Sequence, residues 1–495
     1  MKKYLIIILM VELCSGQQIE WFVSYNGSGE ESMGHFIIQC EDGGFLQVGE
    51  TYFFSNPVST KLYVVKTNID GLKIWDNEIY ISGHNLGNSV LESTDGYIIF
   101  GGLDQNSSII KLNKDSGAVI YNKSYDNGGT DAYENGVETP YGIVAVGYIN
   151  SEDPYNSFYT EGEGFISFLD NEANEITSFS IGDYISQAYR IKLFNNELYI
   201  SGLTQEALNY KMIKMSLEGD IIWHYEYGGS GSDHCFAMDM NDQGEIFLAG
   251  HTTSNTENWD VYTIKLNNEG EVLWENKIGN PRGFNPIYIH DEAWGVRSTL
   301  DGGCVTVAGT GDEYDEYSEC DGSVCSDIWN AYIIKYDSNG LVTWSETFSP
   351  LDIGNENYDW AAEDLALTTD GGAVIAIDNG QFGFLKLNNI QNTVSTNNSN
   401  MIPMRLTLAQ NYPNPFNPVT TLQYDLPQDG LVNITIYDVM GSVVRTLVNG
   451  SQTAGYNSIQ WNAMNDQNEQ VSAGLYLYTI KVGEFRQTKK MVLLK

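Results

Sequence analysis

Residues 260–274 have the sequence DVYTIKLNNEGEVLW, and similar stretches recur as KLYVVKTNIDGLKIW (61–75), NYKMIKMSLEGDIIW (209–223) and NAYIIKYDSNGLVTW (330–344). Each stretch contains two apolar, largely β-branched runs separated by a turn with glycine. This pattern predicts two antiparallel strands joined by a hairpin. A unit that recurs every 40–50 residues or so is typical of propellers and solenoids.

Two more strands precede each hairpin, for example WGVRST (294–299) and GCVTVAGT (303–310). Four such strands form one propeller blade. The last unit ends after its third strand, near Leu387, whereas IEWFVSY (19–25) resembles a fourth strand without a blade. The sequence therefore predicts an all-β chain with a seven-bladed β-propeller whose N-terminal strand closes the last blade. The seven third strands are centred on Lys66, Lys111, Phe168, Lys214, Lys265, Lys335 and Lys386.

Three repeated residue types have predicted structural roles. The tryptophan that closes the stretch is expected to pack between neighbouring blades. Glycines in the first-to-second and third-to-fourth turns, such as Gly96 and Gly117, are expected to have positive φ. The third-strand lysine is expected to form a repeated ion pair or to lie across the adjacent strand, with a ring of ligand-binding lysines as the alternative.

The N-terminus has the features of an export signal. Lys2 and Lys3 precede an apolar run too short to anchor the chain in a bilayer, and small residues follow it. We therefore expect residues 1–16 to be a signal peptide and the mature chain to have no membrane span. The net charge of −40 lies almost entirely before residue 401, since 401–495 holds 7 basic and 6 acidic residues. Such an acidic body excludes nucleic acid and anionic membranes as partners.

The last quarter of the chain is predicted to be a separate domain. The propeller is assigned to 17–389, and the polar segment 390–402 is typical of a flexible linker. Residues 403–495 show alternating strands and a hairpin turn at Asp438–Gly441, which predict a small β-sandwich of about seven strands.

Two resemblances to known families follow from these motifs. The repeats resemble β-propeller repeat proteins of secreted bacterial origin. NYPNPFNP (411–418), IYDVMGSVV (436–444), GLYLYTIKVG (474–483) and KKMVLLK (489–495) resemble the C-terminal sorting domain of type IX secretion cargo, which is related to FlgD-like immunoglobulin folds. This resemblance implies that 403–495 is recognised by the type IX machinery and that the protein reaches the cell surface or the medium.

The longest loops are expected on one face of the propeller, which makes that face the candidate functional face. Loop 309–330 is rich in carboxylates, which could hold Ca²⁺ as a cofactor; a solvated acidic loop is the alternative. Cys320 and Cys325 in this loop are predicted to form a disulfide. The calcium candidates are Asp312, Asp315, Glu316 and Asp321.

Loop aromatics on this face are candidates for stacking on sugar rings, or else for packing the loops: Tyr155, Tyr159, Trp259, Tyr314, Tyr317 and Trp329. Asp233, Asp291 and Asp359 are predicted near the mouth of the central channel, as ligand-binding groups or as turn caps. His234 and His290 fall near this group, and the other four histidines are dispersed along the chain. We predict a non-catalytic surface module that binds a glycan or another surface partner. The alternatives are a polysaccharide-acting enzyme with carboxylates at the channel mouth and a structural or adhesive protein.

Overall fold

The structure is a computed structural model that divides into two compact units, one within residues 17–393 and one within 394–495. It describes residues 19–54, 58–151, 162–204, 209–256, 258–279, 290–311, 329–349, 352, 360–390, 407–408, 411, 414–426, 430–452, 455–467, 469–483 and 485–494.

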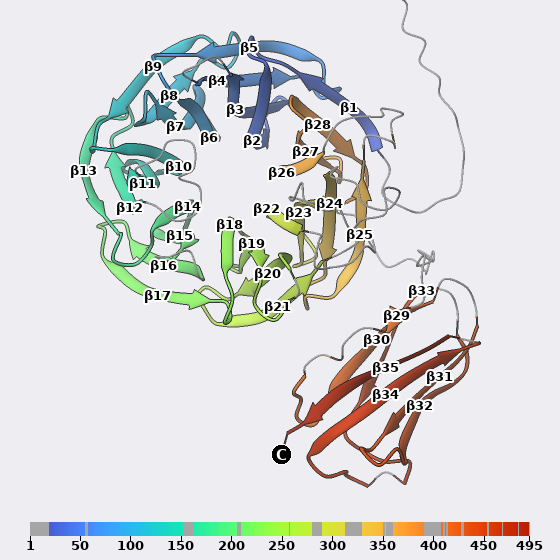
Figure 1. The fold of residues 1–495 in the computed structure, drawn as a ribbon. Helices are drawn as coiled ribbons and strands as arrows, with labels where there is room; N and C mark the ends of the chain where they lie inside the picture. The colour runs from blue at the N-terminus through green and yellow to red at the C-terminus, as the bar shows by residue number, and fades with distance from the viewer. Residues whose placement is uncertain are drawn as a thin grey trace, which may run out of the picture. The chain divides into compact units, whose positions relative to one another are not determined.

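The first unit consists of seven four-stranded antiparallel sheets, which Figure 1 shows as a ring of blades with the first strand of each blade nearest the central axis. A seven-bladed β-propeller is therefore what the chain forms. Blades 1 to 3 are β2 (Glu31–Gln39), β3 (Phe45–Phe53), β4 (Ser59–Thr67) and β5 (Lys73–Ile79); β6 (Asn85–Ser93), β7 (Gly96–Leu103), β8 (Asn106–Leu112) and β9 (Val119–Tyr125); and β10 (Thr130–Thr139), β11 (Gly142–Ser151), β12 (Glu163–Leu169) and β13 (Glu175–Ser180). Blades 4 to 6 are β14 (Gln187–Phe194), β15 (Glu197–Leu203), β16 (Tyr210–Ser216) and β17 (Ile221–Tyr227); β18 (Asp233–Met240), β19 (Ile246–Thr252), β20 (Asp260–Leu266) and β21 (Val272–Ile278); and β22 (His290–Ser298), β23 (Cys304–Gly311), β24 (Asn330–Tyr336) and β25 (Val342–Phe348).

Blade 7 combines the two ends of the propeller sequence. It consists of β26 (Ala361–Leu367), β27 (Ala373–Asp378), β28 (Phe382–Leu387) and the N-terminal strand β1 (Ile19–Tyr25). β1 pairs antiparallel with β28, with Trp21 opposite Lys386 and Tyr25 opposite Phe382. The predicted closure is thus confirmed, and it covers the edge that β28 would otherwise expose.

The repeated tryptophan and the repeated turn glycine meet between neighbouring blades. A Cβ added to Gly117 of blade 2 would lie 2.4 Å from the indole of Trp75 in blade 1, and one added to Gly340 of blade 6 would lie 2.5 Å from that of Trp274 in blade 5. These glycines also have φ of 66° and 80°. Both space and backbone conformation therefore require glycine, and the predicted packing of the tryptophans between blades is confirmed.

Two turns differ from the expected pattern. Ser93, the last residue of β6, pairs directly with Gly96, the first of β7, so the turn is only two residues long. Gly96 itself is not among the glycines with positive φ, and the prediction for it was wrong. In blade 3, Ala173 takes the place of the third-to-fourth turn glycine with a φ of 55°.

The third-strand lysines are buried and form ion pairs, as predicted. The closest acidic partner of each lysine lies at or beside the first-to-second turn of the same blade, so the ammonium group joins two turns at the short-turn end of the blade. The pairs are Lys66–Asp42 (2.8 Å), Lys111–Asp95 (2.5 Å), Lys214–Glu197 (2.9 Å), Lys265–Glu245 (2.8 Å), Lys335–Asp301 (2.7 Å) and Lys386–Asp370 (3.0 Å).

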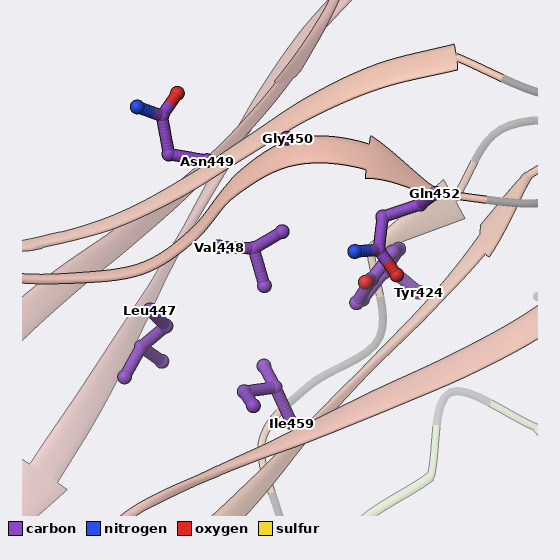
Figure 2. A pocket seen from close by; sticks show the side chains of 7 residues that line it. All are labelled: Tyr424, Leu447, Val448, Asn449, Gly450, Gln452 and Ile459. Carbon is purple, nitrogen blue, oxygen red and sulfur yellow. The ribbon is translucent and has the colours of Figure 1, made fainter.

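The second unit is a β-sandwich of seven strands in its described residues, as predicted. One sheet has the order β29 (Thr407–Leu408), β30 (Thr420–Leu426), β33 (Gly455–Trp461), and the other the order β32 (Val443–Gln452), β31 (Gly430–Tyr437), β34 (Gly474–Val482), β35 (Phe485–Leu493). Trp461 and Tyr478 are buried between the sheets. Leu447, Val448 and Ile459 line a cavity of about 290 Å³ where β32 and β33 face each other (Figure 2).

Candidate functional site

Most residues predicted to bind a ligand or metal lie outside the described residues, so their roles stay predictions. These are Tyr155, Tyr159, Tyr314, Tyr317 and Asp359, the calcium candidates Asp312, Asp315, Glu316 and Asp321, and the pair Cys320 and Cys325. Within the described part of the chain, no group of three or more His, Cys, Asp or Glu side chains is arranged to hold a metal ion.

Asp233 lies at the start of an innermost strand and is completely buried. Its Oδ2 accepts hydrogen bonds of 2.8 Å from the Gly229 backbone nitrogen and the Ser254 hydroxyl, and its Oδ1 accepts one from the Thr252 hydroxyl. The carboxylate thus ties the segment that enters blade 5 to the second-to-third loop of that blade, which is the capping role that the sequence left open. Buried aspartates occupy the same position in blades 3 and 6: Asp131 and Asp291.

The two loop tryptophans that the structure places differ in their surroundings. Trp259 belongs to a cluster of rings, with its centroid 4.7 Å from that of His234 and 4.8 Å from that of His251. Trp329 covers β23, because a Cβ added to Gly311 would lie 2.6 Å from its ring. Trp259 therefore lies beside the innermost strand β18, whereas Trp329 packs its loop segment against the blade.

A ring of seven side chains, absent from the sequence predictions, surrounds the axis of the propeller. Each innermost strand has a β-bulge at the same register position, so one residue per blade has no partner in the second strand. The free edge of this strand faces the axis. The extra residue has no partner in the sheet, so strand pairing does not constrain it. We call these residues the axial ring: His35, Asn88, Glu134, Tyr189, Phe236, Trp294 and Glu363 in blades 1 to 7.

Three consecutive blades contribute the aromatic half of the axial ring. The Phe236 ring lies 5.0 Å from Tyr189 on one side and 4.4 Å from Trp294 on the other, between centroids. His251 extends this surface, 5.2 Å from Phe236. The result is a continuous aromatic wall over blades 4 to 6, in which Tyr189 and Phe236 are buried and Trp294 is partly exposed. Trp294 is therefore the ring of this wall on which a ligand could stack.

The other half of the ring contains two partly buried carboxyl groups. Glu134 and Glu363 form no hydrogen bond or ion pair with any described residue. Burial raises the pKa of Glu134 to about 7, opposed by Arg190 and His35. Burial, with the nearby Asp378, raises the pKa of Glu363 to about 8. His35 acts on both groups, so side chains from blades 1, 3 and 7 converge near the axis.

His35 also belongs to a buried charge network with Glu50 and His84. Glu50 Oε2 lies 2.9 Å from His84 Nε2, and its Oε1 lies 3.5 Å from His35 Nε2. Burial opposes ionisation of Glu50, but the two histidines outweigh it and lower its pKa far below the usual range. Burial likewise opposes charge on His35, yet Glu50 raises its pKa. Two histidines that are far apart along the chain therefore meet at one carboxylate.

Phe36, Arg190 and Arg297 fill the axis on the short-turn side of the axial ring. The two guanidinium carbons lie 5.4 Å from the centre of the Phe36 ring, although the three residues come from blades 1, 4 and 6. Arg297 also donates a hydrogen bond of 2.8 Å to Asp364. Beyond this contact, a cavity of about 390 Å³ opens toward the short turns. The axial ring therefore lies between the contact and the long loops.

Comparison with known proteins supports the fold but does not assign an activity. Residues 419–484 match the model of the FlgD Ig-like domain. No curated protein matches the chain significantly. In the described residues there is no helix with the length and apolar character needed to cross a membrane.

Among solved structures, the chain is similar to PorZ of Porphyromonas gingivalis, described as an essential bacterial surface component of the type-IX secretion system (12% identity, TM-score 0.42, 96% of this chain and 61% of PorZ). It is also similar to virginiamycin B lyase of Staphylococcus aureus (12% identity, TM-score 0.46, 74% of this chain and 99% of the lyase). A third similar structure is the Pan2 WD40 domain of Neurospora crassa (11% identity, TM-score 0.41, 73% of this chain and 97% of the domain). At this identity the likeness concerns the fold alone.

Proposed function

We propose that the protein is an exported, non-catalytic binding protein whose propeller holds a glycan at the axial ring. The observation that carries the proposal is the division of the ring into an aromatic wall and a polar half. Sugar rings have apolar faces that stack on aromatic side chains and hydroxyl groups that donate to carboxylates. A site with these two surfaces on a rigid scaffold suits such a ligand.

A glycan array, followed by calorimetry on the full chain with the oligosaccharides that bind, tests this proposal. Trp294→Ala removes the end of the aromatic wall and is expected to weaken binding about tenfold or more. Tyr141→Ala is the matched control, because Tyr141 is 71% exposed in a first-to-second turn, away from the long loops. Absence of binding to any glycan, or equal loss in both variants, contradicts the proposal.

The raised pKa values of Glu134 and Glu363 favour a second candidate, an enzyme that cleaves glycosidic bonds. A carboxyl group with a pKa of about 8 remains protonated at neutral pH and is able to act as a general acid. Incubation of the full chain with polysaccharides distinguishes the two candidates. Release of reducing ends that Glu363→Gln abolishes would replace the binding proposal with the enzymatic one.

We further propose that residues 403–495 direct the protein through type IX secretion to the outer surface or the medium. The match of 419–484 to the FlgD Ig-like domain and the sandwich fold support this proposal. Deletion of 403–495 in a bacterium with this machinery is expected to retain the propeller inside the outer membrane, as measured by cell fractionation. Unchanged export of the truncated chain contradicts the proposal.

A further inference from the structure

The cavity of about 390 Å³ at the short-turn end of the axis has an apolar side and a charged side. Its apolar side includes Ile38, Ala366 and Leu367, from the innermost strands of blades 1 and 7. Its charged side includes Arg297 and Asp239, from the innermost strands of blades 6 and 5. A cavity of this size lies at the lower end of the range that holds small molecules.

The Arg297 guanidinium in this lining has N–H groups that the protein does not use. One nitrogen donates a hydrogen bond of 2.8 Å to the Val296 carbonyl oxygen, and another donates one of 2.8 Å to Asp364 Oδ2. A guanidinium carries five N–H donors, so three of them have no acceptor among the described residues. Because the side chain lines the cavity and is 17% exposed, these donors are within reach of a molecule in the cavity.

The acid in the same lining is already satisfied. Asp239 Oδ1 lies 2.7 Å from Lys192 Nζ, and its Oδ2 accepts hydrogen bonds of 2.8 Å from the backbone nitrogen and the hydroxyl of Ser298. A ligand that brings a cation or a hydrogen-bond donor therefore gains little from this carboxylate. The donors of Arg297 remain the polar groups of the lining that lack a partner.

Positive charge also gathers around Phe36, at the closed end of the cavity. Both Arg190 and Arg297 lie 5.4 Å from the centre of this ring, but only Arg297 forms an ion pair within the described residues. The acids that act on Arg190 are Asp364, which is paired with Arg297, and Glu134, which has a pKa of about 7. In a chain with a net charge of −40, a local excess of cations distinguishes this end of the axis.

We propose that this cavity is a second binding site, which takes a small carboxylic acid with an apolar chain. A carboxylate accepts hydrogen bonds and donates none, and its two oxygens match the planar fork of a guanidinium. The chain of such a ligand would lie along Ile38, Ala366 and Leu367, where it loses contact with water. The contact of Phe36 with the two arginines separates this site from the axial ring, so it does not depend on the proposed glycan site.

Three ligands test the two sides of the cavity separately: octanoate, octanamide and acetate, titrated into the full chain by calorimetry at pH 7. Octanoate is expected to bind about tenfold tighter than octanamide, because the hydrogen bonds from a guanidinium are stronger to a charged acceptor than to a neutral one. It is also expected to bind at least about tenfold tighter than acetate, which has no chain to bury. Absence of octanoate binding, or equal affinity for octanoate and either of the other ligands, would overturn the inference.

A substitution at Arg297 adds a test of its role. Arg297→Lys keeps the positive charge but loses the planar fork, and is expected to weaken octanoate binding about tenfold while leaving octanamide unaffected. Arg445→Lys, the same substitution in the second unit, is the matched control. Unchanged octanoate affinity in Arg297→Lys contradicts the proposal. The comparison of the three ligands needs no variant, so it decides the question even if Arg297→Lys does not fold.

Discussion

The buried lysine of blade 6 tests what holds the short-turn end of a blade together. The Lys335 side chain is completely buried, and its Nζ donates hydrogen bonds of 2.7 Å to Asp301 Oδ2 and to the Tyr336 carbonyl oxygen. The Asp301 side chain is 38% exposed. Removing the carboxylate leaves a buried cation without its counter-charge, whereas removing the lysine leaves a carboxylate that water reaches. We therefore expect Asp301→Asn to be more destabilising than Lys335→Met.

The magnitudes follow from the exposure of each partner. Removing one partner of a fully buried ion pair costs about 3–5 kcal/mol. Since Asp301 is partly exposed and the bond to Tyr336 remains, we expect about 2 kcal/mol for Asp301→Asn. In Lys335→Met, the apolar stem is largely kept, and Asp301 still accepts hydrogen bonds from Thr299 and Gly303. That variant should lose less than about 1 kcal/mol.

Thermal unfolding of the full chain, followed by tryptophan fluorescence, measures both variants. Nine of the ten tryptophans precede residue 390, so the signal reports mainly on the propeller. An unfolding entropy of about 2.1 cal/mol/K per residue over roughly 370 residues gives about 0.8 kcal/mol/K. The expected decreases in Tm are therefore about 2.5 °C for Asp301→Asn and about 1 °C or less for Lys335→Met. Equal decreases, or the reverse order, would refute the argument that an unpaired buried lysine dominates the cost.

Three further predictions concern the cap, the axial ring and the closure. Asp233→Ala should lower Tm by about 2–4 °C, because it leaves three hydrogen-bond donors unsatisfied, and should leave ligand affinity unchanged at 20 °C. If Asp233 contacted a ligand instead, the affinity would fall and Tm would stay the same. Glu134 and Glu363 have pKa values raised above the unfolded value of 4.5, so the folded state holds more protons than the unfolded state between pH 4.5 and 8. The free energy of unfolding should therefore fall as the pH rises through this window, by at most about 1.4 kcal/mol per pH unit and group. Glu363→Gln should flatten this decline in a Tm-against-pH profile. Deletion of residues 17–26 should leave the β28 edge open and cause aggregation, which size-exclusion chromatography measures. A monomer with unchanged Tm would show that β1 does not close the ring.

The fold was predictable because the repeat constrains the same contact in blade after blade. A tryptophan over the next turn glycine, or a lysine on an acidic turn, must be kept wherever blades of similar geometry pack, so the pattern is visible in one sequence. Gly96 shows where this inference fails. The Asp-Gly pair there resembles the others, but a hairpin one residue tighter places the glycine inside β7. Turn register depends on strand pairing, which the dipeptide alone does not determine.

The candidate site was only partly predictable, since the features that mark a loop residue do not mark a bulge residue. Trp259 was found because aromatic loop residues stand out in composition, and it does lie in the ring cluster. Asp233 was selected because its predicted place is near the channel mouth, yet its carboxylate is used to cap a loop. Among the axial ring residues, six of seven follow Gly, Ala or Cys, with Glu134 after Tyr133 as the exception. Only this weak signal, read across aligned repeats, could have located the ring.

The bulge also distinguishes the axial ring from the repeated contacts that hold the blades together. Each side chain that lies on a face of a blade contacts the next blade, so its size and polarity are fixed by packing. A bulge residue in the innermost strand has no partner in the second strand, so the pairing of the sheet places fewer demands on its chemistry. Seven such positions therefore carry His, Asn, Glu, Tyr, Phe and Trp, whereas the lysine position keeps one residue type in six blades. The contrast is expected if the outer contacts preserve the ring of blades and the axial ring determines what the protein binds.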